Sequence, residues 1–438
     1  MKLNQIKIKK LFDLYNYNID LSNYDNIKII TGPNGYGKST IIRLVYQLYC
    51  TNFYHFFNTT FDQFELGFEN EKSESFILKI RRIVIKPDNE VFSDEAIAES
   101  DIQLYVSLEI KENNYEAIIH KSVFEKTVKT LGFTKIEEDL WLNNLSELYI
   151  STNELIRTHP EIIDKQFDKA TEILMFLGAL DAVMIADQRL IHSGYEIRSI
   201  ARNKFYINKV QVLLNADKLI EIIARLKSKF KEDLQGSMLK AFSQTPVKAM
   251  SESDYKMHLS KLNDKIKLNL IHFGIADESQ IIDYSYPDEL AVAKTNLLIE
   301  YENVVEKILN EIKDIQLFEQ LIQNSEFPDK AMKLDTTNGY SFTLTNGTFL
   351  FADRLSSGEQ HKLILYFKLL FEAQTGILVL IDEPELSFHV VWQSTFIEEL
   401  KRIVTQKKLQ AIVATHSPQI IDGKWSLTKD LFELNTNN

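Results

Sequence analysis

The chain has 438 residues, and at about 150 residues per domain this length predicts two or three structural units. Asp and Glu (62) outnumber Lys and Arg (50), and the formal net charge of −12 excludes a protein that coats nucleic acid non-specifically, so any DNA contact requires a local basic patch. The single cysteine, Cys50, excludes an internal disulfide and a multi-cysteine zinc site, and no signal-peptide core or membrane-spanning apolar run is present, which predicts a cytoplasmic protein without membrane contact.

The first half of the chain predicts strands around a glycine-rich loop. Short apolar runs indicate strands at 3–11, 15–19 and 26–30, and after the loop the apolar spacing of residues 41–50 is helical. Residues 62–125 alternate apolar and polar side chains, as antiparallel strands with one solvated face do. Residues 137–180 are predicted to be helical and lead to the buried run AVMIA at 182–186.

The second half predicts a helical arm followed by further strands. Between 208 and 327 the sequence is rich in charged residues, and its apolar residues have helical spacing. A helix unbroken from Glu289 to Phe327 would be about 60 Å long. After residue 328 strand patterns return, with a turn at Asn346-Gly347 and the buried run ILVLI at 377–381. The chain is therefore expected to divide into segments 1–207, 208–327 and 328–438, the middle one being an insertion.

The glycine-rich loop matches a phosphate-binding pattern. Gly32-Pro33-Asn34-Gly35-Tyr36-Gly37-Lys38-Ser39 fits GxxxxGK[ST] between a predicted strand and a predicted helix. The glycines let backbone amides turn toward a phosphate, and the helix that begins near Lys38 directs its N-terminal dipole to the same place. Lys38 supplies a charge to the β- and γ-phosphates, and the Ser39 hydroxyl can ligate Mg²⁺. The pattern predicts ATP and Mg²⁺ as cofactors, with binding residues Asn34, Gly35, Gly37, Lys38, Ser39 and Thr40.

A second motif supplies carboxylates. The segment ILVLIDEPE predicts a buried strand that ends in Asp382, the candidate metal ligand, and Glu383, the candidate general base for an attacking water. Upstream, LSSGEQ opens a helix that Ser356 or Ser357 can cap. Gly358 precedes Asp382 by 24 residues, which is room for one helix and one strand.

The order of these motifs resembles that of ABC-type ATPase heads. The order is a glycine loop, LSSGE, a strand ending in Asp-Glu, and a strand ending in Thr415-His416-Ser417. The resemblance implies an α/β fold: a P-loop ATPase head with an antiparallel β subdomain and an inserted helical arm, the head being formed by 1–207 and 328–438. It also implies that Ser356 and Gly358 complete the ATP site of a second copy, and that His416 senses the γ-phosphate. Gln188, at the end of AVMIA, matches the glutamine that couples the metal to the helical region, and a solvated turn is its alternative interpretation.

A narrower resemblance concerns the residues around the acidic pair. Asp382-Glu383-Pro384-Glu385 followed by Ser387-Phe388-His389 looks like the ATPases of the OLD, RecF and PtuA or AriA group, although Val390 stands where a proline is common. Ser357 likewise stands where transporters of the wider family carry glycine. The 22 residues after His416 are too few for a nuclease domain, and Cys50 alone cannot form a zinc hook.

These features lead to one expected function and two alternatives. The resemblance to PtuA and AriA implies a slow ATPase that forms homo-oligomers through head-to-head dimers and controls a separately encoded nuclease effector in antiphage defence. The first alternative is a RecF- or SMC-like repair ATPase that binds DNA directly, and the second is a nucleotide-dependent scaffold. The basic run at 79–86 and the cluster Arg198, Arg202 and Lys204 are interpreted as solvated faces, with a DNA track as the other possibility.

Overall fold

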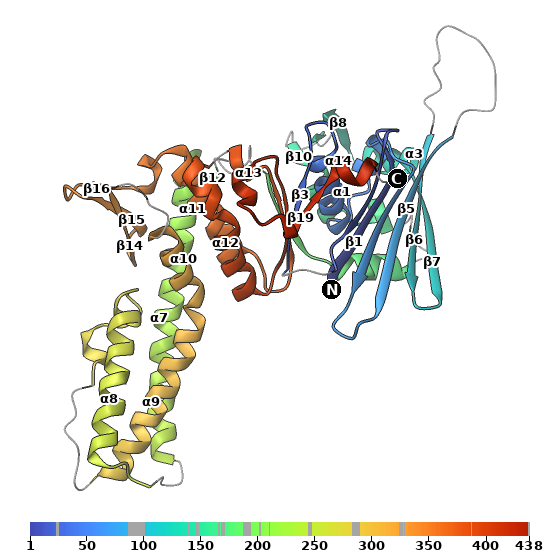
Figure 1. Ribbon diagram of the computed structural model, residues 1–438. Coiled ribbons are helices and arrows are strands. Elements are labelled where there is room, and N and C mark those ends of the chain that lie inside the picture. Colours follow the sequence, from blue (N-terminus) through green and yellow to red (C-terminus); the bar gives the residue numbers. More distant parts are fainter. Residues whose placement is uncertain are drawn as a thin grey trace, which may run out of the picture. The chain divides into compact units, whose positions relative to one another are not determined.

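The chain divides into two compact units, the first formed by Met1–Asp187 and Ala373–Asn438 and the second by Gln188–Glu372. The computed structural model describes residues 1–22, 26–85, 101–137, 140–144, 149–164, 167, 171–186, 194–200, 203–209, 211–243, 248–282, 290–323, 327, 329–386 and 388–436. In the first unit, the blue N-terminal elements and the red C-terminal elements of Figure 1 share one fold. The glycine-rich loop and the acidic strand end, which come from opposite ends of the sequence, therefore lie in the same unit.

A six-stranded antiparallel sheet forms one layer of this unit, in the order β2-β1-β4-β5-β6-β7. Its strands are β1 (Lys2–Leu11), β2 (Tyr15–Asp20), β4 (Gln63–Glu69), β5 (Ser75–Ile85), β6 (Asp101–Ile110) and β7 (Asn113–His120). On β5 the buried residues Phe76, Leu78 and Ile80 alternate with residues that are more exposed. The structure thus confirms the antiparallel strands predicted between 62 and 125.

A parallel five-stranded sheet forms the second layer, in the order β11-β17-β18-β3-β19. It consists of β11 (Ala182–Ala186), β17 (Leu378–Asp382), β18 (Gln410–Ala414), β3 (Ile27–Thr31) and β19 (Thr428–Asp430). The register pairs Asp382 with Ala186 on one side and with Ala414 on the other, so three strands end level at one edge. Ligand sites of parallel sheets lie at this carboxyl edge.

Helices cover both faces of the parallel sheet, which is why its central strands β17, β18 and β3 are rich in Ile, Val and Leu. Helix α12 (Val390–Lys407) lies on the opposite face from α1 (Lys38–Tyr49), as Figure 1 shows. The core joins Ile41 and Leu48 of α1 to Leu66 of the antiparallel sheet and Leu380 of the parallel sheet. Helix α1 is therefore packed between the two sheets, and burial at such a position holds its N-terminus rigidly at the sheet edge.

The smaller elements of the first unit include strands where helix was predicted. A three-stranded sheet has the order β10-β9-β8, with β8 (Phe133–Glu137), β9 (Leu140–Asn143) and β10 (Tyr149–Ser151). The helical prediction for 137–180 is therefore wrong at β9 and β10, because cross-strand pairing and the burial of Trp141, whose Nε1 donates to Thr152 Oγ1 at 3.0 Å, outweigh local propensity. The remaining helices are α2 (Tyr54–Asn58), α3 (Lys121–Thr130), α4 (Thr152–Thr158), α5 (Glu161–Asp164), α6 (Thr171–Gly178), α13 (Pro418–Ile421) and α14 (Leu431–Thr436), with 3₁₀ turns η6 (Pro384–Leu386) and η7 (Trp425–Leu427).

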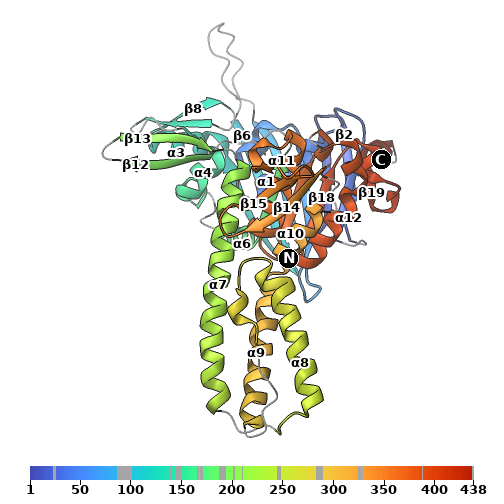
Figure 2. The same ribbon diagram turned by 90° about the vertical axis from the view of Figure 1, so that its left-hand side faces the viewer.

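The second unit contains the helical arm. Helices α7 (Gln211–Ser243), α8 (Glu252–Lys265) and α9 (Ala291–Glu311) lie side by side in Figures 1 and 2, which confirms the inserted arm. These three helices fall within the predicted segment 208–327. The division into segments 1–207, 208–327 and 328–438 stays a prediction. The unit also contains β12 (Gly194–Ile200), β13 (Asn203–Lys209), η2 (Ile266–Ile271), η3 (Glu278–Gln280), α10 (Lys313–Gln323), β14 (Lys330–Asp335), β15 (Gly339–Leu344), β16 (Phe349–Leu350), η4 (Ala352–Arg354), α11 (Ser357–Phe367) and η5 (Lys368–Glu372).

The 289–327 segment does not form the single long helix that its apolar spacing allowed. Helix α9 ends at Glu311 and α10 begins at Lys313, with Ile312 between them. Ile308, Ile312 and Ile315 are all buried, so the apolar stripe continues across the break and conceals it. Within the described part of the chain, no helix has both the length and the apolar character needed to cross a membrane.

Candidate nucleotide site

The glycine-rich loop connects β3 to α1 at the carboxyl edge of the parallel sheet. Gly37 is the N-cap of α1 with φ 86°, and a Cβ there would lie 2.6 Å from Leu11 Cδ2, so that both conformation and space require glycine. No side chain caps this helix N-terminus. Its first backbone N–H groups are therefore available to an anion, which the helix dipole also favours.

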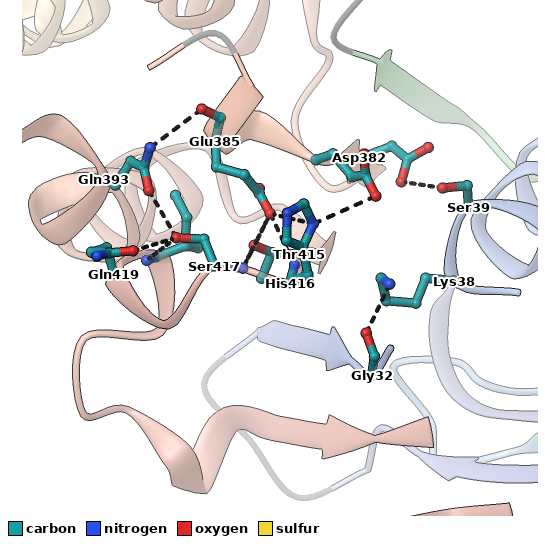
Figure 3. Close-up of polar contacts among 12 residues, drawn as sticks. Gly32, Lys38, Ser39, Asp382, Glu385, Gln393, Thr415, His416, Ser417 and Gln419 are labelled. Carbon is teal, nitrogen blue, oxygen red and sulfur yellow. Dashed lines mark hydrogen bonds and ion pairs between the residues drawn. The ribbon is translucent and has the colours of Figure 1, made fainter. Parts of the chain in front are cut away.

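Lys38 and Ser39 lie at the start of the helix. Lys38 is 4% exposed, and its ammonium donates to the carbonyl oxygens of Gly32 and Pro33 at 2.9 and 3.2 Å. The Ser39 hydroxyl donates to Asp382 Oδ1 at 2.9 Å, although the two residues are 343 positions apart in the sequence. Figure 3 shows this contact between α1 and the end of β17. The fold therefore brings together the two motifs that the sequence predicted to share a metal ion.

The Ser39 and Asp382 oxygens fit a magnesium ion. Hydroxyl and carboxylate oxygens are the ligands that Mg²⁺ prefers. Burial raises the pKa of Asp382 above its usual range and Glu383 adds to this, whereas the hydrogen bond from Ser39 and the charges of Arg43 and Lys38 lower it. A bound cation would stabilise the ionised form of this buried carboxyl group.

Glu383 and His416 lie beside this pair. Glu383 has φ 47°, a left-handed conformation that is unusual for a residue other than glycine, and its N–H donates to the carbonyl oxygen of Ala414 at 2.9 Å. His416 Nδ1 is 3.7 Å from Glu383 Oε1 and 3.2 Å from Glu385 Oε1. The candidate base and the candidate phosphate sensor are therefore in contact with one another at the ends of β17 and β18.

Aromatic residues and the C-terminal segment support the loop from the side. The Tyr17 hydroxyl, whose pKa is raised by burial, donates to the carbonyl oxygen of Tyr36 at 2.8 Å, and the Tyr15 ring stacks on Tyr36 with centroids 5.0 Å apart. Thr31 Oγ1 donates to Asp430 Oδ2 at 3.0 Å. A cavity of about 410 Å³ adjoins the loop, lined by Thr31, Gly32, Pro33, His416, Pro418, Ile421, Trp425, Asp430, Phe432 and Glu433.

The LSSGE segment forms a capped helix start in the second unit. Ser356 is the N-cap of α11: its hydroxyl accepts from the Glu359 N–H at 3.4 Å, while Glu359 Oε2 accepts from the Ser356 N–H at 2.8 Å. Of the two serines proposed as caps, Ser356 is therefore the one used. Gly358 lies in the first turn, and Glu359 is buried and pairs with Lys330 at 2.6 Å.

The other predicted residues have different outcomes. Asn34 is exposed in the loop and Thr40 is half-buried in the first turn of α1. Gln188 lies outside the described residues, as do the side chains of the Arg198, Arg202 and Lys204 cluster, although β11 ends at Ala186, level with Asp382.

Two residues of the basic run on β5 have partners within the first unit. Lys79 lies 3.2 Å from Glu109 and 3.7 Å from Glu65, and Arg82 donates to the carbonyl oxygen of Phe57 at 3.1 Å. These contacts favour the interpretation of the run as a strand face over a DNA track.

Sequence reasoning assigned no role to Glu385, which lies at the centre of the polar network in Figure 3. Its Oε1 accepts from the Thr415 hydroxyl at 2.6 Å and from the N–H groups of His416 and Ser417 at 2.9 and 3.2 Å. Only the repetition of acidic residues after β17 could have drawn attention to it. Strand β19, which adds to the sheet beside β3, was also missed because it is three residues long.

Comparison with known proteins agrees with the motifs. Residues 205–422, just under half of the chain, match the family described as "AAA domain, putative AbiEii toxin, Type IV TA system". No curated protein matches the chain.

Solved structures similar to the chain include SMC head domains. One, from Pyrococcus furiosus and bound to the C-terminal domain of ScpA, has 12% identity over 96% of this chain and 90% of that one, with a TM-score of 0.34. Another, from Thermotoga maritima, has 11% identity over 96% and 92%, with a TM-score of 0.33. Scores this low do not establish a common fold, and the strand order and motif geometry of this chain carry the assignment. That strand order and the P-loop that faces the acidic strand end give the chain the α/β fold of a P-loop ATPase head with an inserted helical arm, and residues 205–422 are similar to the AAA-domain family.

Proposed function

We propose that the protein binds and slowly hydrolyses ATP with Mg²⁺, and that this cycle switches its assembly. The observation that carries the proposal is the 2.9 Å contact from Ser39 to Asp382, with Glu383 next in the chain. This contact supports the proposal because it joins a P-loop hydroxyl to a carboxylate at one edge of the sheet, and phosphoryl transfer to water uses such a pair to hold a metal ion.

Different residues of the chain bind the phosphates, hold the metal ion and accept the proton in the proposed reaction. The loop amides and the N-terminus of α1 bind the phosphates, and Lys38 adds a positive charge to them. Ser39 and Asp382 would hold Mg²⁺, which supplies further charge on the phosphate oxygens. Glu383 accepts a proton from the attacking water. Its neighbour His416 lines the cavity beside the glycine-rich loop.

Two chains are proposed to form each complete site. Ser356 and Gly358 begin α11, an eleven-residue helix, and can offer its first N–H groups to the nucleotide of a second copy. The motif order supports a homo-oligomer built from such head-to-head dimers.

The biological role proposed is that of a cytoplasmic sensor in antiphage defence that controls a separate nuclease. The resemblance to PtuA and AriA supports this role, and the family description, which names a toxin and a Type IV TA system, is compatible with it. Native mass spectrometry of the tagged protein, purified from its host with ATP and Mg²⁺, tests the role. A large homo-oligomer carrying a nuclease is expected, whereas a bare dimer that retains only DNA would favour the repair alternative.

Substitutions at the site test the chemistry. Lys38→Ala is expected to abolish ATP binding, whereas Glu383→Gln is expected to retain binding and to lower kcat by about 10²–10⁴-fold, the usual contribution of a general base. Phosphate release and nucleotide binding are measured separately. Lys72→Ala and Glu398→Gln, which change exposed residues of the same unit, serve as matched controls. Unchanged turnover in Glu383→Gln would refute the assignment of the base.

A further inference from the structure

Glu385 accepts hydrogen bonds from the loop that carries His416. Its Oε1 accepts three hydrogen bonds, from the Thr415 hydroxyl and from two backbone N–H groups, and His416 Nδ1 lies 3.2 Å from the same atom. Glu385 is 8% exposed. Hydrogen bonds to a buried carboxylate are strong because the low dielectric around them weakens competition from water.

The chain path explains why this side chain reaches the loop. Strands β17 and β18 are parallel and end level, and the left-handed backbone of Glu383 turns the chain toward β18. The short η6 turn follows, and its backbone is held from the far side by Gln393, whose Nε2 donates to the carbonyl oxygen of Glu385 at 3.3 Å. Gln393 Oε1 in turn accepts from the Ser417 hydroxyl at 2.8 Å. Glu385 is therefore bound to the loop through both its side chain and its backbone.

The contacts of His416 assign the hydrogen on its ring. Ionised carboxylates only accept hydrogen bonds, and both groups facing Nδ1, Glu385 and Glu383, are carboxylates. A neutral ring with its hydrogen on Nδ1 therefore suits both neighbours better than a ring with its hydrogen on Nε2. An unconstrained imidazole prefers the opposite tautomer, so the contact has a measurable signature.

We propose that Glu385 is a positioning residue that fixes both the tautomer and the orientation of His416. It holds Nδ1–H toward its own carboxylate and leaves the lone pair of Nε2 available on the opposite edge of the ring. That lone pair suits an O–H donor in the nucleotide complex, such as the attacking water. The role in turnover rests on the proposed ATPase function, but the tautomer itself does not.

The second oxygen of Glu385 makes a clean substitution possible. Oε2 is buried and has no hydrogen-bond partner among the described residues. In Glu385→Gln the amide oxygen can still accept from every donor of the loop, and the amide nitrogen takes the place that Oε2 now occupies without a partner. Glu385→Ala removes the acceptor altogether and leaves the Thr415 hydroxyl and the His416 N–H unpaired, while the Ser417 N–H keeps its bond to Thr415 Oγ1.

Nitrogen NMR of the full chain with ¹⁵N-labelled histidine, without nucleotide, tests the inference. His416 is identified by the resonances that disappear in His416→Asn. Wild type and Glu385→Gln are expected to show the Nδ1–H tautomer. Glu385→Ala is expected to show the Nε2–H tautomer, because Glu383 Oε1 lies 3.7 Å from Nδ1, beyond hydrogen-bonding distance. Glu433→Ala, which removes a carboxylate lining the adjoining cavity, is the matched control and is expected to leave the wild-type tautomer.

Turnover supplies the second readout. We expect kcat to fall at least about 10-fold in Glu385→Ala with ATP affinity changed less than about twofold, because the P-loop is untouched, and to stay within about threefold in Glu385→Gln. If Glu385→Ala does not fold, Glu385→Asp, which withdraws the carboxylate by one methylene, replaces it. An Nε2–H tautomer in wild type, or an unchanged tautomer in the alanine or aspartate variant, overturns the inference. A wild type without ATPase activity but with the expected tautomer would refute the proposed function alone.

Discussion

Lys28 is a charged residue in a buried strand that contains three isoleucines. Strand β3 has the sequence IKIIT and all five of its residues are buried, Lys28 at 3% exposure. Burial, together with repulsion from Lys429, lowers the pKa of Lys28 to about 8, although Asp20 acts in the opposite direction. Folding therefore disfavours the charged form of this lysine.

Replacement of Lys28 by methionine is expected to raise stability in a pH-dependent way. At pH 7 the lysine is charged in both states and the cost of burying it is present in full. Between about pH 8 and 10.5 the folded protein loses this proton before the unfolded chain does, so wild-type stability rises with pH there. The melting temperature of Lys28→Met should exceed that of wild type by about 2–4 °C at pH 7, as about 1 kcal/mol produces in a unit of this size, and the difference should vanish near pH 10.5. A difference independent of pH would contradict the assignment.

At the scale of single elements, α11 shows how one residue can serve both folding and function. Ser356 was selected from the sequence as a contact to a second copy, and the structure shows its hydroxyl within a capping box with Glu359. Ser356 and Ser357, at the start of the helix, are both exposed, whereas Glu359 of the capping box is buried. The two roles can be separated by experiment: the contribution of the cap to stability is measured without nucleotide, and the contact to a second copy is measured with nucleotide.

Ser356→Ala is expected to destabilise the nucleotide-free protein by about 1 kcal/mol, the usual cost of losing an N-cap. Ser357→Ala, one position later and equally exposed, is the matched control and should cost close to nothing, since alanine favours the helix interior. Urea denaturation followed by circular dichroism measures both. Equal losses in the two variants would show that the capping box contributes no stability.

At the scale of the whole molecule, the proposed dimer predicts complementation between two inactive variants. Lys38→Ala disables the P-loop of its own chain, and Gly358→Glu places a negative charge on the helix start offered to a second chain. A mixed dimer retains one site with both parts intact. Equal mixing should therefore restore about a quarter of wild-type ATPase activity, because half of the dimers are mixed and each has one working site of two.

The complementation assay includes its own controls. Each variant alone should be inactive, and the double variant Lys38→Ala/Gly358→Glu mixed with wild type should restore nothing beyond the activity of the wild-type chains. Additive activities without gain on mixing would show that each chain completes its own site.

Much of the nucleotide site could be predicted from sequence because its signals are local. The glycine loop, the strand before it and the helix after it are contiguous, and the buried run before Asp382 marks a strand by composition alone. The same local reasoning failed at Trp141, where strand pairing overrode helical spacing, and at Ile312, where a continuous apolar stripe concealed a break.

The sequence by itself determined the candidate groups for the proposed chemistry: the P-loop residues, Asp382, Glu383 and His416, each selected by residue type and spacing. Tertiary structure alone decided their partners. Ser39 meets Asp382 across 343 residues, and Glu385 meets the His416 loop because two parallel strands end level. Hydrogen bonds depend on positions in space to within a few tenths of an ångström, and only the packing of α1 between two sheets and the register of β17 with β18 determine positions that finely.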